Sequence, residues 1–174
     1  MRKEQLRAIV FVLVAFMLGC NEYVIVGVLP DVAHEYHVSL ASLGYVVTIF
    51  AFVYALSTPI ITSVAGRWPR HKVLLALMVV FLIGNTWTAL AKGYWALILS
   101  RMLTATVAGA IISLVLVIAA FVAPPAKRAG LVSWIFAGFS IASVIGVPIG
   151  TLVSQHLTWH DSFWMITWLT VIVM

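Results

Sequence analysis

The sequence predicts an all-α integral membrane protein with about six membrane-spanning helices. Two observations carry this prediction. Only 9% of the 174 residues are charged, whereas soluble domains carry roughly 25%. The apolar residues make up 64% of the chain and fall into long continuous runs separated by short polar links. Such runs are typical of spanning helices, because the strands of a membrane β-barrel alternate apolar and polar residues instead.

The apolar runs give the expected helix boundaries within one transmembrane domain, residues 1–174. They predict helices at about 8–29, 40–66, 73–92, 95–123, 129–154 and 162–174. The first five can cross a bilayer, which requires roughly 20 residues. The last run is shorter than this, so we expect a truncated sixth helix. Pro30 is expected to lie in the first link, because proline removes a helical hydrogen bond.

Basic residues gather in alternate links and predict the orientation of the chain. One side is expected to hold Arg2, Lys3, Arg7, Arg67, Arg70, Lys72, Lys127 and Arg128, whereas the other holds Lys92 with Asp31, Glu35 and Asp161. Cytoplasmic links of membrane proteins are enriched in Lys and Arg. We therefore expect a multi-pass protein with a cytoplasmic N-terminus. The cations form no continuous basic face, which argues against nucleic acid as a partner.

Two charged residues fall inside the expected helices, Glu22 in the first and Arg101 in the fourth. A charge at the centre of a membrane helix costs roughly 2.5–3.5 kcal/mol, so such residues usually face a polar cavity or a partner. Their similar depth makes an ion pair feasible. We expect a cavity with Glu22, Arg101, Asn21 and Thr104 that binds substrate or couples protons. The alternative is that Arg101 extends to the interface and Glu22 is hydrated there.

Small residues recur at a spacing of four in the fifth expected helix, at Gly138, Ala142, Gly146 and Gly150. This spacing places them on one face, where another helix can pack closely. Pro148 lies within the same stretch, and proline commonly bends a membrane helix. The stripe therefore predicts either ordinary tight packing or a bend in a moving interface.

The link between the second and third helices is a tight basic turn that contains Gly66, Arg67, Arg70 and Lys72. Orientation and attraction to anionic lipids explain these cations without a further role. No Ser/His/Asp set points to an enzyme, and the histidines follow no strong metal-binding spacing, so we expect no cofactor or metal. Cys20 is the one cysteine, so no intrachain disulfide is expected. Residues 17–20, which end at Cys20, loosely resemble a lipoprotein cleavage site. The apolar run continues beyond Cys20, however, which favours an uncleaved helix.

Several of these motifs, in the same order, resemble the major facilitator superfamily. More narrowly, they are similar to its bacterial drug/proton antiporter branch, which contains sugar-efflux and purine-efflux permeases. The resemblance rests on residues 21–23 with 27–30, the 66–72 turn, Arg101, the 138–150 stripe and residues 159–163. The turn departs from the family pattern, since Gly66 stands where an aspartate is usual. This departure weakens the family's charge-relay account of that turn.

The resemblance implies the N-terminal six-helix bundle of a larger fold, built from two inverted three-helix repeats around a midplane site. Arg101 matches a fourth-helix arginine that the family associates with proton coupling, and the stripe with Pro148 resembles the fifth-helix antiporter motif. The implied function is proton-coupled efflux of a small molecule, such as a sugar, a nucleoside or purine, or a drug, by alternating access across the bacterial cytoplasmic membrane.

The implied partners are the small-molecule substrate, protons, the lipid bilayer and a missing C-terminal six-helix half. The chain is therefore expected to be an incomplete half of a secondary active transporter. Two other classes stay open. One is a six-helix channel or membrane subunit, and the other is a non-functional truncated remnant.

Overall fold

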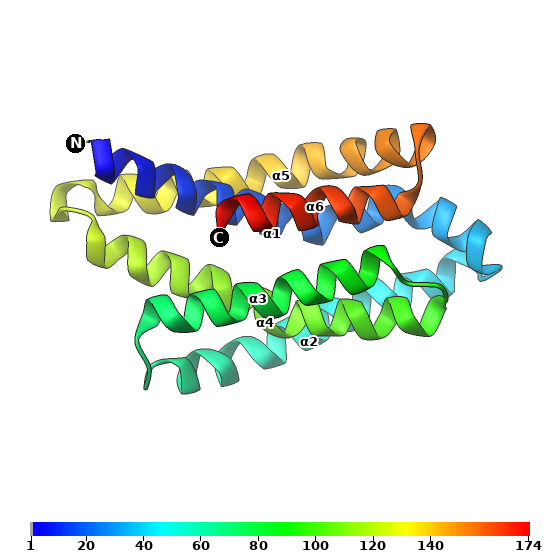
Figure 1. Ribbon diagram of the computed structural model, residues 1–174, viewed down its shortest axis with the longest axis horizontal. Coiled ribbons are helices and arrows are strands. Elements are labelled where there is room, and N and C mark those ends of the chain that lie inside the picture. The colour runs from blue at the N-terminus through cyan, green and yellow to red at the C-terminus, as the bar shows by residue number, and fades with distance from the viewer. Residues whose placement is uncertain (1) are drawn as a thin grey trace.

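The continuous apolar runs form helices throughout the computed structural model, which describes residues 2–174, with side chains from residue 5 onward. The elements in chain order are α1 (Arg2–Tyr36), α2 (Leu40–Ala65), α3 (Arg70–Ala89), α4 (Tyr94–Val122), the short 3-10 helix η1 (Pro125–Lys127), α5 (Arg128–His156) and α6 (Trp159–Val173) (Figure 1). By length and composition, α1 to α5 can each cross a membrane. The predicted all-α membrane fold is thus confirmed.

α1 is longer than expected and passes through Pro30 without ending. Its C-terminal turns are held by contacts with distant segments. The Asp31 carboxylate accepts a hydrogen bond from the Ser154 hydroxyl of α5, and the Tyr36 hydroxyl donates to the Ala91 carbonyl at 2.7 Å. The prediction that Pro30 lies in a link is therefore wrong, because these tertiary contacts stabilise a helix that proline alone would weaken.

α6 begins at Trp159 rather than at residue 162, and it contains 15 residues. Its start is fixed by a capping box, in which the Thr158 side chain and backbone N–H both interact with Asp161. At a rise of ~1.5 Å per residue, α6 is about 22 Å long, which is shorter than the ~30 Å hydrocarbon core of a bilayer.

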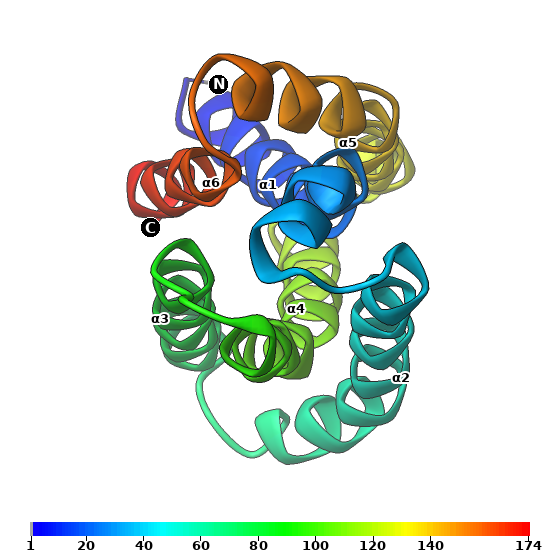
Figure 2. The same cartoon turned by 90° about the vertical axis from the view of Figure 1, so that its right-hand side faces the viewer.

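The helices form two groups, with α1, α5 and α6 in one and α2, α3 and α4 in the other (Figure 2). α1 packs mainly on α5, and α4 packs mainly on α2 and α3. The pattern of buried and exposed residues over 11–25 of α1 is the same as that over 101–115 of α4. α1 and α4 therefore hold equivalent positions, as expected for two inverted repeats whose first helices are exchanged between the groups.

The small-residue stripe of α5 forms the contact with α1. Gly138, Ala142, Gly146 and Gly150 are all buried. A Cβ atom at Gly138 would lie 2.7 Å from the Val12 carbonyl oxygen of α1. The two backbones therefore approach more closely than any larger residue allows, and the Thr151 hydroxyl donates to the Gly27 carbonyl across the same interface at 3.0 Å. Tight packing accounts for the stripe.

Pro148 lies on a different face of α5. It is exposed, whereas the stripe residues on either side are buried. α5 continues as one helix through Pro148 to His156. The interpretation of this proline as a bend in a moving interface therefore stays a prediction.

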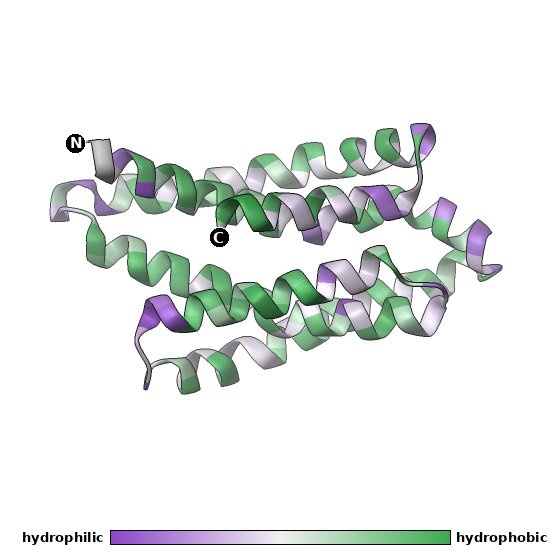
Figure 3. Cartoon of the chain, viewed as in Figure 1, coloured by the Kyte–Doolittle hydropathy of each residue, from purple (hydrophilic) through white to green (hydrophobic). Residues whose placement is uncertain are grey.

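The polar residues gather at the two ends of the bundle, and apolar residues cover most of the length between them (Figure 3). The start of α1, the α2–α3 turn and the α4–α5 connection share one end, which we call the basic end; its described cations are Arg7, Arg67, Arg70, Lys72, Lys127 and Arg128. The opposite end, called the acidic end, contains Asp31, Glu35 and Asp161 together with Lys92. The structure thus separates the charges as the link pattern predicts.

The close approach of α1 and α5 predicts that a glycine in the stripe tolerates a larger side chain less well than a glycine on an open helix face. In Gly150→Ala, the new Cβ would lie 2.8 Å from the Val24 carbonyl oxygen. Because this atom belongs to the backbone, we expect a loss of roughly 1–3 kcal/mol of stability, measured by thermal unfolding in detergent.

Gly44→Ala on α2 is the matched control, since a Cβ there meets nothing within 4 Å. It should leave stability unchanged or raise it by up to about 1 kcal/mol, because alanine favours helix more than glycine does. Equal effects of the two substitutions would contradict the packing described for the stripe.

Candidate functional site

Arg101 is the most deeply buried charged side chain of the described residues, with only 1% of its surface exposed. Its guanidinium reaches from α4 to α1. Nη1 donates to the Asn21 Oδ1 atom at 2.8 Å, and Nη2 donates to the Asn21 backbone carbonyl at 2.9 Å. Arg101 therefore does not extend to the interface in this structure, whereas the other part of that alternative, a hydrated Glu22, stays a prediction.

Two aromatic rings complete the surroundings of the Arg101 guanidinium. Its central carbon lies 4.3 Å from the centre of the Phe50 ring of α2 and 5.6 Å from that of Phe163 of α6. A cation over an aromatic face is stabilised by up to about 2 kcal/mol when water is excluded. Through Asn21 and these rings, Arg101 joins α4 to α1, α2 and α6.

Glu22 and Arg101 line the same small cavity, as their depths in the sequence predict. This cavity has a volume of about 40 Å³ and is otherwise apolar, with walls from Ile25, Val46, Val47, Phe50 and Ala51. Within the described residues, Arg101 hydrogen-bonds to Asn21 alone among side chains, and no ion pair joins it to Glu22. The two charged residues line this cavity without an ion pair between them.

Two buried donors make no hydrogen bond within the described residues: Arg101 Nε, whose residue lines this cavity, and Asn21 Nδ2, whose residue does not. An unpaired donor in an apolar interior costs roughly 1–3 kcal/mol. These atoms can therefore donate to an acceptor oxygen that enters the site. The chemistry available here is a fixed positive charge, a nearby carboxyl group and two free donors.

Thr104 does not belong to this cavity. Its hydroxyl donates to the Arg101 carbonyl one turn earlier at 2.9 Å, and its methyl group lies against Gly84 of α3. Neither Thr104 nor Asn21 is among the residues that line the cavity, and a part for them in substrate binding or proton coupling stays a prediction. A polar residue one turn from Arg101 faces α3, because successive helical turns do not return to the same direction.

The basic turn between α2 and α3 connects to α4 through Arg70. The Arg70 guanidinium lies over the Phe121 ring near the end of α4, at 4.1 Å from the ring centre. Gly66 caps α2, and its N–H donates to the Thr62 carbonyl at 3.3 Å. Arg67 and Lys72 are exposed. Arg70, the first residue of α3, thus joins this end of α3 to the end of α4 by a cation–π contact.

Two contacts at this site could not be predicted from the sequence. Phe50 is one of many aromatic residues in apolar runs, and nothing in its spacing separates it from exposed neighbours such as Phe52. Phe163 belongs to a recognised motif at the start of α6, but its contact with Arg101 depends on how α6 packs. Among the described residues, no group of three or more His, Cys, Asp or Glu side chains is placed to hold a metal ion.

Comparison with known proteins agrees with the fold. The sequence profile of the Major Facilitator Superfamily matches residues 11–174. The chain is 35% identical over 173 residues to the uncharacterized MFS-type transporter YfhI of Bacillus subtilis. The aligned region covers 98% of this chain and 44% of the relative. It is also 34% identical over 160 residues to the inner membrane transport protein YdhP of Escherichia coli. Here the aligned region covers 92% of this chain and 41% of the relative.

A further Bacillus subtilis relative, the uncharacterized MFS-type transporter YbcL, is 33% identical and covers 95% of this chain and 42% of its own length. The chain thus spans less than half the length of these relatives. With a family match over nearly the whole chain and the helical arrangement described above, the chain belongs to the major facilitator superfamily of membrane transporters.

Proposed function

We propose that this chain is the N-terminal half of a secondary transporter that exports a small molecule in exchange for protons. The proposal rests on one observation above all. A buried arginine on α4 and a half-buried carboxyl group on α1 line the same cavity, and ionisable residues inside a membrane typically mark substrate or proton pathways. α1 and α4 are the two equivalent helices of the repeats, and they would face the second half across a central cavity.

Glu22 is the proposed proton carrier. It is half-buried and, unlike Arg101, has no hydrogen-bond partner among the described side chains. When Glu22 is ionised, its charge opposes that of Arg101 across the cavity. When a proton binds, the cavity carries an unbalanced positive charge, which favours a conformation with more water or an anionic group at the site. A proton can bias two conformations in this way because it interacts differently with each.

Arg101 would keep its position in both states. It is oriented by Asn21, which is neutral, rather than by Glu22. Protonation of Glu22 therefore changes the electrostatic field at the site without releasing the arginine. The two unpaired donors, Arg101 Nε and Asn21 Nδ2, would serve acceptor oxygens of the substrate. Sugars, purine nucleosides and many drugs all carry such oxygens.

The remaining motifs fit this proposal. The small-residue stripe of α5 holds the part of α1 that contains Asn21 and Glu22 in place, because Gly146 packs beside Tyr23. The basic end is proposed to face the cytoplasm, since cytoplasmic links are enriched in Lys and Arg. A bacterial cytoplasmic membrane is the proposed location, and a second six-helix half the proposed partner.

Glu22→Gln tests the coupling role in the intact transporter that contains this chain, reconstituted in vesicles. Efflux driven by a pH gradient should fall at least about tenfold, because glutamine cannot exchange a proton. Exchange of substrate between the two sides without net proton movement should persist. A labelled sugar, a purine nucleoside and a cationic dye serve as the test panel, with internal pH followed by a fluorescent indicator.

Asp31→Asn is the matched control, since Asp31 lies on the same helix but bonds to Ser154 at the acidic end. It should retain gradient-driven transport. Unchanged rate and pH dependence in Glu22→Gln would exclude the coupling role. A substrate flux through the unmodified protein that does not depend on the pH gradient would favour a channel instead.

A further inference from the structure

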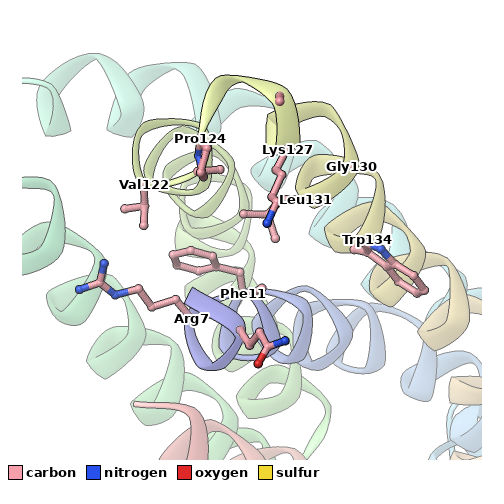
Figure 4. Close-up of a pocket in the computed structure, with 12 residues that line it drawn as sticks. Arg7, Phe11, Val122, Pro124, Lys127, Gly130, Leu131 and Trp134 are labelled. Carbon is pink, nitrogen blue, oxygen red and sulfur yellow. The ribbon is translucent and has the colours of Figure 1, made fainter. Parts of the chain in front are cut away.

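A pocket of about 440 Å³ opens at the basic end, between the start of α1, the end of α4, η1 and the start of α5. Its cationic residues are Arg7 and Lys127, and the rest of its wall is largely apolar, with Phe11, Leu131 and Trp134 prominent. Figure 4 places Arg7 and Lys127 on either side of Phe11, with Trp134 farther along α5. No carboxylate contributes to this wall among the residues that the structure describes.

The pocket continues into an apolar groove along the surface of α1 and α5. This second hollow, of about 510 Å³, shares Gln5, Ala8, Leu131 and Trp134 with the first and extends to Val12 and Leu13. Trp134 and Ile9 are more than half exposed beside it. A ligand that fits both parts needs an anionic group at one end and a long apolar chain at the other.

The three cations near the α4–α5 connection differ in their contacts. Arg128 is engaged, because its Nε donates to the Ala123 carbonyl at the end of α4. Arg7 and Lys127 make no ion pair or side-chain hydrogen bond with the side chains of residues 5–174. Cations near a charged membrane surface attract anionic lipid headgroups, and these two have no acidic partner among the described side chains.

We propose that this pocket binds one anionic phospholipid from the leaflet at the basic end. Arg7 and Lys127 hold the phosphate, and an acyl chain lies in the groove against Leu131, Trp134 and Val12. The bound lipid contacts both the start of α1 and the α4–α5 connection. This site is separate from the Arg101 cavity, so the inference does not depend on proton coupling.

The experiment uses the 174-residue chain in mild detergent, with phosphatidylglycerol and phosphatidylcholine of the same acyl chains as probes and native mass spectrometry as the readout. Phosphatidylglycerol should bind more tightly than phosphatidylcholine. Arg7→Gln and Lys127→Gln should each weaken its binding about 5-fold, and the double variant about 25-fold, towards the level of phosphatidylcholine.

Two further variants separate the pocket from general charge effects. Arg67→Gln removes an exposed cation at the same end outside the pocket and should leave phosphatidylglycerol binding unchanged. Gly130→Phe leaves the charge unchanged but fills the pocket, since a Cβ at Gly130 meets nothing within 4 Å. It should therefore fold normally and still prevent lipid binding.

The proposal is overturned if phosphatidylcholine binds equally well, or if Arg67→Gln weakens binding as much as Lys127→Gln. It is also overturned if Gly130→Phe, folded by its melting temperature, binds phosphatidylglycerol as the unmodified chain does. Competition by inorganic phosphate that is as strong as competition by the lipid would show a site for the free ion, and would contradict a role for the acyl groove.

Discussion

The buried Arg101 guanidinium is the constraint around which this bundle is organised. A positive charge inside a membrane protein is stable only where acceptors or negative charge surround it. Asn21 supplies two acceptors, one from its side chain and one from its backbone, and Phe50 and Phe163 supply aromatic faces. One side chain on α4 thereby fixes the relative positions of three other helices.

This interaction also joins the two helix groups. α1 belongs with α5 and α6, and α4 with α2 and α3, while α1 and α4 touch each other much less extensively. The Arg101–Asn21 contact crosses that limited interface. The glycine stripe of α5 supports it from behind, because the close approach at Gly138 and Gly150 sets the position of α1. Glu22, next to Asn21, is therefore placed at the junction of the groups, where a change in charge has most effect.

The sequence predicted the helices well wherever apolar length decided the structure. The boundaries of α2, α4 and α5 follow from their runs, and the depth of Glu22 and Arg101 follows from the helical rise. It failed for α1 beyond Pro30, because the stabilising partners Ser154 and Ala91 are distant in the chain. Distant contacts leave no local pattern.

The hydrogen-bond partner of Arg101 also could not be predicted from the sequence. Asn21 and Glu22 have almost the same depth, but successive residues point about 100° apart around a helix. Depth can be counted from the sequence, whereas the rotation of α1 about its axis is set by packing against α5. For the same reason Thr104 faces Gly84 of α3 instead of the cavity. The sequence thus placed Glu22 and Arg101 at one depth, but it did not indicate that Arg101 would hydrogen-bond to Asn21.

The most direct measurement of this account is a pair of double-mutant cycles on thermal unfolding of the chain in detergent. One cycle combines Asn21→Leu with Arg101→Leu, and the other combines Glu22→Gln with Arg101→Leu. Because Arg101 hydrogen-bonds to Asn21, the first cycle should give a coupling energy of about 1.5–3 kcal/mol, as for hydrogen bonds to charged groups. The second should give a smaller value. A stronger coupling of Arg101 to Glu22 than to Asn21 would contradict the account.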